Sequence, residues 1–186
     1  LYNNQTLLQK KLDLTDTVIS LSTARNGPQL YKLLFSTPSG DTTSLHRDFW
    51  ISHGKEKLLH QLPRTLAKTE WGELRINRSV DNNTLRASGI PFSWGLGIHA
   101  PSQIDISLNG EWSTLRFIAA LDDESLCGDG AVFEVRGDGV TLFKSKALYA
   151  MEWQKGEVNV QGVHHLSLLT LQRDNNMCDH TEWLHG

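Results

Sequence analysis

The sequence lacks several features that would place it in common classes of protein. No hydrophobic run approaches the ~18 apolar residues of a transmembrane helix, so we predict no membrane span. There is no Gly-x-Ser-x-Gly motif, and the Gly-x-Gly segments precede predicted strands and not helices, which excludes the usual hydrolase nucleophile and phosphate cradle. No spacing of Cys and His residues is typical of a zinc site.

Basic residues are scarce in the larger, C-terminal part of the chain. Residues 70–186 hold nine Lys and Arg against sixteen Asp and Glu, a net charge of −7, whereas residues 1–69 carry a net charge of +4. Binding to a phosphate backbone needs a basic surface, and the excess in residues 1–69 is spread along the segment. We therefore expect no nucleic acid among the partners.

Long amphipathic helical patterns are missing as well, and short alternating segments take their place. Polar and apolar residues alternate through residues 103–108 and 113–121, which is typical of half-buried strands. Gly137-Asp138-Gly139, between two further apolar segments, is a hairpin signal. Many short strands with Gly, Asn and Asp turns predict an all-β fold, an antiparallel β-sandwich, over residues 70–186.

Residues 1–69 have a weaker pattern. Residues 29–35 resemble a strand, which we expect to pair with residues 17–22 across the turn signal Asn26-Gly27-Pro28. The segment has few large apolar residues for a core of its own. We therefore predict that residues 1–69 form a mostly β extension that packs on the sandwich of residues 70–186.

The stretch from Trp94 to Ser102 contains two glycines, a histidine between apolar residues, and a proline. We expect it to form a loop that leads into the strand at residues 103–108. Trp94 lies beside a glycine in this loop and is a candidate platform for a ligand with an apolar face. His99 has two interpretations, since a neutral imidazole can hydrogen-bond either a ligand hydroxyl or a backbone carbonyl of its own loop.

Two polar loops each follow an apolar strand. The first contributes four carboxylates, those of Asp122, Asp123, Glu124 and Asp129. They are candidate Ca²⁺ ligands, acceptors for sugar hydroxyls, or caps for the local backbone, and Ca²⁺ would need about 6–8 oxygens. The second loop contains Asp179 and His180, which either face a ligand or brace the second loop against the first.

The only two cysteines lie one in each of these loops. If the loops meet at one end of the sandwich, Cys127 and Cys178 can form a disulfide, which requires Cα atoms within about 7 Å of each other. Such a bridge indicates an oxidising compartment. The alternative is a pair of buried, reduced cysteines.

Separated motifs of the C-terminal part resemble one known family. They are Asn77–Asn83, Leu85–Phe92, Gly95–Ala100 with Ser102, Asp122-Asp123-Glu124, Val132–Val135 with Gly137-Asp138-Gly139, and Asp179-His180 with Trp183. In this order and spacing they resemble the NPCBM domain, a carbohydrate-binding module found with glycoside hydrolase family 98 and grouped with the family-51 carbohydrate-binding modules. The resemblance covers about residues 70–186.

The resemblance implies a β-sandwich of galactose-binding type, often with bound Ca²⁺, that binds galactose-containing glycans without catalysis. The carbohydrate-binding residues are then expected to be Trp94, His99, Asp122, Asp123, Asp179 and His180. The expected calcium ligands are Asp123, Glu124 and Asp129. We also expect an extracellular, periplasmic or cell-surface location and a separate catalytic domain outside this chain. Two alternatives stay open: a protein-interaction or assembly domain without sugar binding, and an accessory domain of a larger glycosidase.

Overall fold

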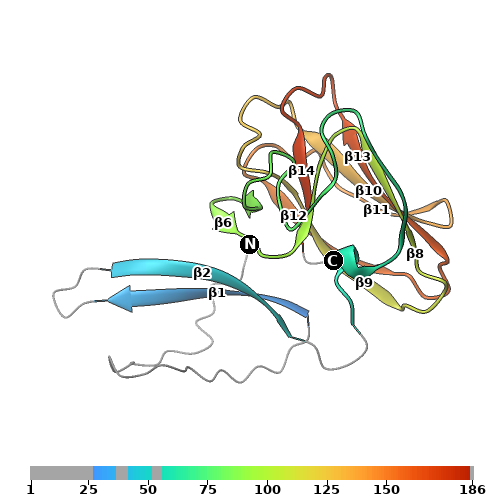
Figure 1. The fold of residues 1–186 in the computed structure, drawn as a ribbon, viewed down its shortest axis with the longest axis horizontal. Coiled ribbons are helices and arrows are strands. Elements are labelled where there is room, and N and C mark those ends of the chain that lie inside the picture. The colour runs from blue at the N-terminus through green and yellow to red at the C-terminus, as the bar shows by residue number, and fades with distance from the viewer. Residues whose placement is uncertain (1–26, 37–41, 52–55, 185–186) are drawn as a thin grey trace.

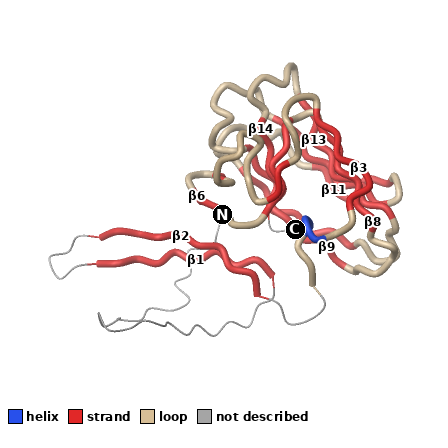
Figure 2. Tube along the Cα trace, in the orientation of Figure 1, coloured by secondary structure: helices blue, strands red, loops and turns tan. Residues whose placement is uncertain are grey.

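The computed structural model describes residues 27–36, 42–51 and 56–184. Almost all of this part is strand and loop, and its one helical element is the 3₁₀ turn η1 (Leu59–Gln61) (Figure 2). Two antiparallel five-stranded sheets form the main body, and a two-stranded hairpin lies beside them (Figure 1). The predicted antiparallel β-sandwich is therefore confirmed.

The first sheet has the strand order β11-β10-β13-β8-β3. Its members are β3 (Arg64–Thr69), β8 (Ser102–Ser107), β10 (Ala131–Gly137), β11 (Val140–Lys144) and β13 (His165–Gln172). The turn between β10 and β11 places Asp138 and Gly139 at φ of 47° and 83°, as a two-residue hairpin turn requires. The strand at residues 103–108 and this hairpin are as predicted.

The second sheet has the order β12-β9-β14-β7-β4. Its members are β4 (Arg75–Ile76), β7 (Gly95–His99), β9 (Thr114–Leu121), β12 (Trp153–Asn159) and β14 (His180–Leu184). The prediction of loops at β7 and β14 was wrong. Every residue of β7 is buried and so are four of the five in β14, because both faces of the sheet are covered at these two strands. Such strands lack the alternation by which half-buried strands are found.

The hairpin beside the sandwich consists of β1 (Gly27–Ser36) and β2 (Thr42–Ile51). The strand predicted at residues 29–35 is confirmed, and it pairs with β2. Its pairing with residues 17–22 stays a prediction. The expected partner, residues 17–22, lies outside the described residues. The sequence between the two strands contains Pro38-Ser39-Gly40-Asp41, which are turn-forming residues of the same kind as those chosen at Asn26-Gly27-Pro28.

The sandwich begins before residue 70, where the predicted boundary lies. β3 pairs with β8 as an edge strand, and Leu59 of η1 belongs to the main core. No residue of β3 is fully buried, so this strand has little of the apolar signal that marks the inner strands. That residues 1–69 pack as a whole on the sandwich stays a prediction.

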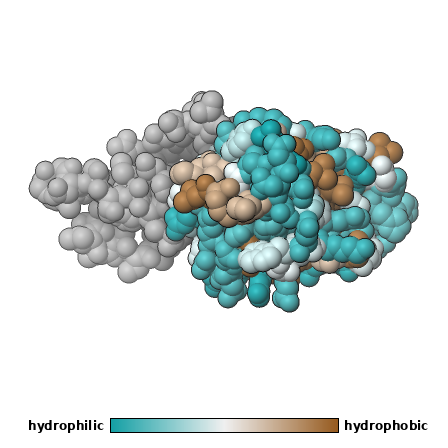
Figure 3. All heavy atoms as spheres, turned by 90° about the horizontal axis from the view of Figure 1, so that it is seen from above, coloured by the Kyte–Doolittle hydropathy of each residue, from teal (hydrophilic) through white to brown (hydrophobic). Residues whose placement is uncertain are grey.

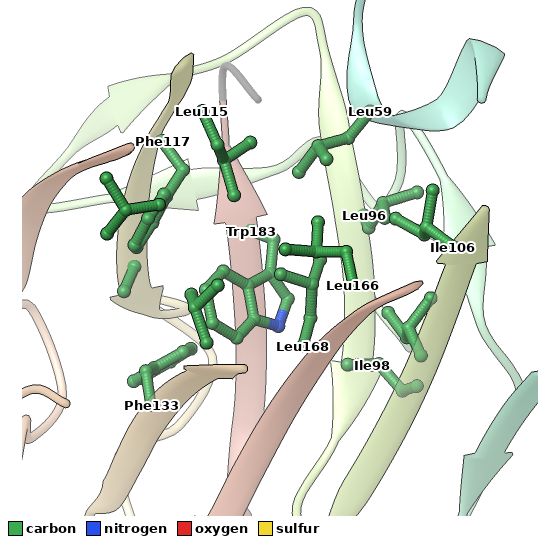
Figure 4. Close-up of a cluster of buried hydrophobic side chains, with 14 of the residues drawn as sticks. Leu59, Leu96, Ile98, Ile106, Leu115, Phe117, Phe133, Leu166, Leu168 and Trp183 are labelled. Carbon is green, nitrogen blue, oxygen red and sulfur yellow. The ribbon is translucent and has the colours of Figure 1, made fainter. Parts of the chain in front are cut away.

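The core lies between the two sheets and is centred on Trp183 of β14. Its indole lies among Phe117, Phe133, Leu166 and Leu168 (Figure 4), with ring centroids 5.2 Å from each phenylalanine ring. Trp183 is therefore a core residue and not a ligand platform.

A second cluster covers the outer face of the β9–β14 pair. It includes Leu85, Ala87 and Phe92, from the segment that contains β5 (Arg86–Ala87) and β6 (Ile90–Pro91). On the face shown in Figure 3, the surface of the described residues is mostly hydrophilic. Within the described residues, no helix has the length and apolar character needed to cross a bilayer.

Candidate functional site

Two histidines lie side by side where β7 ends and β14 begins. The antiparallel register places His99 directly opposite His180, so both side chains are on the same face of the sheet. Their ring centroids are 5.5 Å apart in an edge-on arrangement. His99 is only 5% exposed, so it forms the floor of the site and His180 lies at its rim.

Trp71 completes an aromatic cluster with these two histidines. It lies in the connection between β3 and β4, with its ring nearly parallel to His180 at 5.6 Å and 5.4 Å from His99. The Thr69 hydroxyl fixes this connection, because it is 2.8 Å from the Trp71 carbonyl oxygen and 3.0 Å from that of His99. The indole remains 52% exposed, so it offers an apolar surface to a ligand.

Two carboxylates border the cluster on its polar side. An oxygen of Asp81 lies 3.3 Å from Nδ1 of His180, and an oxygen of Glu124 lies 3.9 Å from the same nitrogen. Glu124 is held by the Ser79 hydroxyl at 3.0 Å and the Asn83 amide at 2.6 Å. The site therefore combines an indole, two imidazoles and two hydrogen-bond-accepting carboxylates.

His99 is suited to bind an uncharged polar group. Burial, and next the neighbouring His180, lower the pKa of His99 below its usual value, so the ring is neutral at pH 7. A neutral imidazole has one donor and one acceptor. Its Nδ1 is buried, and a hydrogen bond with the Ala100 backbone acts on the ring.

The loop that supplies Asp81 rests on β7 because Gly97 has no side chain. A Cβ atom there would lie 2.8 Å from the Ser79 Cα atom and still closer to the Arg78 carbonyl oxygen. Only glycine permits so close a backbone approach. The loop is closed by a hydrogen bond of 3.0 Å from the Ser79 N–H to the Asn83 carbonyl oxygen.

The disulfide between Cys127 and Cys178 is formed, with 5.5 Å between the Cα atoms, as predicted. It joins the two polar loops beside the histidines. The Ser125 hydroxyl and the Asp122 N–H each donate to the His180 carbonyl oxygen at 2.9 Å. The second loop is thus braced against the first, which was one of the two interpretations of Asp179 and His180.

The structure brings together only part of the predicted carbohydrate site. Trp94 precedes β7 and His99 ends it, so the two lie roughly 16 Å apart along the strand. A loop would have allowed Trp94 and His99 to lie at the same end of the sandwich, whereas an extended strand holds them apart. Asp122 and Asp179 are fully buried and are not surface acceptors.

Asp122 pairs with a residue that the sequence analysis missed. Glu182 of β14 is fully buried, and burial, followed by a hydrogen bond with Asp122, raises its pKa well above the usual value. Oδ1 of Asp122 accepts the Glu124 N–H at 2.8 Å and Oε1 of Glu182 accepts the Arg86 N–H at 3.2 Å. The hydrogen bond between the two carboxyls is therefore left to Oδ2 of Asp122 and Oε2 of Glu182. No local pattern identifies this pair, because its members are sixty residues apart.

The three predicted calcium ligands do not converge. Asp123 accepts the Gly89 N–H at 2.7 Å, Glu124 faces Ser79 and Asn83, and Asp129 accepts the N–H groups of residues 174 and 175 at 3.0 and 3.1 Å. Asp123 does line a polar hollow of ≈ 350 Å³, which is bordered by Asn83, Thr84, Arg86, Asp122, Asp123 and Glu124.

Trp71 and Asp81 are the functional candidates that the sequence analysis missed. Trp71 precedes a glycine, as Trp94 does, so both tryptophans have the same sequence neighbour. Asp81 falls within a motif already noted, Asn77–Asn83, but nothing local shows that it faces His180.

Comparison with known proteins places the chain among carbohydrate-binding modules. The profile of the NPCBM/NEW2 domain family matches residues 55–186. An "Alpha-1,3-galactosidase B" of Akkermansia muciniphila is 32% identical over 124 residues, which are 64% of this chain. The match spans only 16% of that protein's length.

Solved structures share the fold. The CBM51 domain of the Clostridium perfringens GH95 protein, in complex with methyl-galactose, has a TM-score of 0.64 at 24% identity and covers 69% of this chain and 96% of its own. The CBM51-2 and INT domains of Clostridium perfringens ZmpB, in complex with GlcNAc, have a TM-score of 0.67 at 22% identity. That match covers 85% of this chain and 36% of the other.

Proposed function

The chain belongs to the NPCBM/NEW2 domain family, a family of non-catalytic carbohydrate-binding modules, and we propose that it binds galactose-containing glycans at the Trp71–His99–His180 cluster. The observation that carries this proposal is the half-exposed Trp71 indole beside a buried, neutral imidazole. Sugars have C–H faces that pack on aromatic rings and hydroxyls that need polar partners. Both kinds of group are present within this cluster.

Galactose is the sugar that this arrangement suits best. Its axial 4-hydroxyl leaves the C3, C4 and C5 hydrogens on one apolar face, which can lie on Trp71. The remaining hydroxyls would meet His99, Asp81 and Glu124, which offer one donor and several acceptors. The galactosidase name of the Akkermansia relative and the methyl-galactose bound to the GH95 domain support this proposal, whereas the ZmpB domain is in complex with GlcNAc.

Replacing Trp71 by Ala is expected to weaken binding of methyl β-galactoside about 30-fold, since loss of a central aromatic contact costs about 2 kcal/mol. Isothermal titration calorimetry measures the change, with methyl β-glucoside as the comparison sugar. The melting temperature should stay nearly constant, because the indole is half exposed.

Trp94→Ala is the matched control, because Trp94 lies at the other end of β7 and its removal should leave the affinity unchanged. If binding were lost in Trp94→Ala and kept in Trp71→Ala, the binding site would lie at the Trp94 end of β7, which would contradict the proposed site. A wild-type protein that binds no sugar on a glycan array would favour the interaction or assembly domain instead.

The module is proposed to act outside the cytoplasm as part of a larger glycan-processing protein. Its disulfide is of the kind that persists in oxidising compartments, which include the extracellular space, the periplasm and the cell surface. The short span of the Akkermansia match leaves room for a separate catalytic domain in that relative, and a ZmpB structure contains an M60 catalytic domain together with CBM51 domains.

Calcium is proposed to bind at the polar hollow, which Asp122 and Asp123 line, with Glu182, the buried partner of Asp122, as a third carboxyl. Oδ1 of Asp123 is buried without a partner among the described residues, and Ca²⁺ would replace the hydrogen bond between Asp122 and Glu182. Hard oxygen ligands are those Ca²⁺ prefers. Asp123 is retained from the predicted set, whereas Asp129 lies elsewhere.

Adding Ca²⁺ at 100 times its Kd to chelator-treated protein should therefore raise the melting temperature by roughly 5–10 °C. The double variant Asp122→Asn, Glu182→Gln should lose the part of this response that belongs to the hollow. A double variant that responds to Ca²⁺ as fully as the wild type does would contradict this site.

A further inference from the structure

Three side chains of metal-binding type converge at the polar side of the candidate site. Asp81, Glu124 and His180 each offer one ligand atom, and these three atoms lie within 4.8 Å of one another. Within the part of the chain that the structure describes, no other group of His, Cys, Asp and Glu has this geometry. The three residues are far apart in the sequence, which is why no short motif indicates the group.

The Nδ1 atom of His180 lies at the centre of this group. An Asp81 oxygen is 3.3 Å from it and a Glu124 oxygen is 3.9 Å from it. The nitrogen is buried, yet it makes no hydrogen bond within the described residues, and the side chain is only 13% exposed. A buried polar atom without a hydrogen bond costs free energy, and an ion bound to this nitrogen would satisfy it together with both carboxylates.

The two carboxylates are positioned and accessible in the way that metal ligands need. The Ser79 hydroxyl and the Asn83 amide both donate to Glu124, and such outer hydrogen bonds orient a metal ligand. No Lys or Arg side chain of the described residues forms an ion pair with Asp81 or Glu124. Asp81 is 38% exposed and Glu124 is 27% exposed, so an ion can enter from solvent and keep a water ligand.

One nitrogen and two oxygens in this spacing suit a small transition-metal ion. Tetrahedral Zn²⁺, with bonds of about 2.0–2.1 Å, places its ligand atoms roughly 3.3 Å apart. The distance from Asp81 to His180 already has this value, and the Glu124 oxygen needs only a small shift. Imidazole is a ligand of Zn²⁺, Co²⁺ and Ni²⁺, whereas Ca²⁺ takes about 6–8 oxygens. Both cysteines are held in the disulfide, so no thiolate competes for the ion.

We propose that Asp81, Glu124 and His180 bind one Zn²⁺ ion, with a fourth coordination position open to solvent, and that this ion regulates sugar binding. The ion would occupy the carboxylates that we assign to sugar hydroxyls, so Zn²⁺ and a galactoside exclude each other. The metal site does not depend on the proposed function, whereas the competition rests on it. A module of this kind releases its glycan as the concentration of free Zn²⁺ rises.

The test is metal titration of the full chain, with its disulfide intact and without a histidine tag. ZnCl₂ is titrated in a calorimeter, and CoCl₂ is followed by visible absorption, where four-coordinate Co²⁺ absorbs strongly. The wild type should bind one equivalent of each ion, and Asp81→Asn and His180→Ala should each weaken binding at least about 10-fold. Asp81 is exposed, so its variant should keep the wild-type melting temperature. His164→Ala is the matched control, because it removes an exposed histidine outside the group and should leave binding unchanged.

Competition is measured with methyl β-galactoside in the absence and presence of Zn²⁺. Zn²⁺ at 10 times its Kd should raise the apparent Kd of the sugar about 10-fold in the wild type, and an unchanged sugar affinity would overturn the competition. Zn²⁺ binding that is retained in full in both Asp81→Asn and His180→Ala would overturn the site. A wild type that binds Zn²⁺ through these residues but binds no sugar would support the metal site and contradict the proposed function.

Discussion

Replacing both Cys127 and Cys178 by Ser is expected to lower the free energy of unfolding by about 4 kcal/mol. The bridge closes a loop with a sequence separation of 51 residues, and the loop-entropy relation gives about 4 kcal/mol for a loop of that size. For a chain of this length the melting temperature should fall by roughly 8–16 °C. Urea unfolding followed by tryptophan fluorescence measures the change.

The wild-type protein treated with a reducing agent provides the control for this variant. Reduced wild type and the double Ser variant should unfold at the same urea concentration, and the reducing agent should not affect the variant. Loss of the disulfide should also loosen the candidate site, because Ser125 and Asp122 of the first loop hydrogen-bond to the His180 carbonyl oxygen. Equal stability of the oxidised wild type and the variant would show that other contacts alone keep the loops together.

The half-buried strands were predictable because their physics is local. Residues 103–108 alternate since one face meets the core and the other is partly exposed. Residues 114–117 alternate in the same way, whereas residues 118–121 of β9 are buried on both faces. The Gly137-Asp138-Gly139 turn is equally local, because positive φ values select these residues. The disulfide was predictable for a different reason, since two cysteines allow a single pairing within the chain.

The fully buried strands and the site were not predictable from local pattern. β7 is buried on both faces, so it lacks polar alternation, and its glycines led to the prediction of a loop. The role of Gly97 is to allow the close approach of the Ser79 backbone. Consecutive carboxylates in the first loop point to different neighbours, and the partner of Asp122 is Glu182 on a distant strand. Trp71 and Trp94 both precede a glycine, but Trp71 reaches His99 from the connection between β3 and β4, whereas Trp94 lies at the other end of β7 from His99.

Gly97 is the position where a single methyl group should cost most. In the middle of a strand, Ala is normally more stable than Gly by roughly 0.5–1 kcal/mol. Strand propensity alone therefore predicts that Gly97→Ala stabilises the protein. The structure predicts the opposite sign, because the new Cβ would overlap the backbone at Arg78 and Ser79. Backbone cannot rotate away as a side chain does, so we expect a loss of about 3 kcal/mol in the free energy of unfolding.

The same substitution should impair the candidate site in the molecules that remain folded. Displacing Ser79 removes the hydroxyl that holds Glu124, and it shifts the loop that carries Asp81. Gly162→Ala is the matched control: Gly162 has a φ of +77° and no atom within 4 Å of its Cβ position, so it carries backbone strain without overlap and should cost only about 1 kcal/mol. Chemical denaturation of the two variants against wild type decides the matter, because a Gly97→Ala protein as stable as the wild type would mean that the loop of residues 77–83 does not rest on β7.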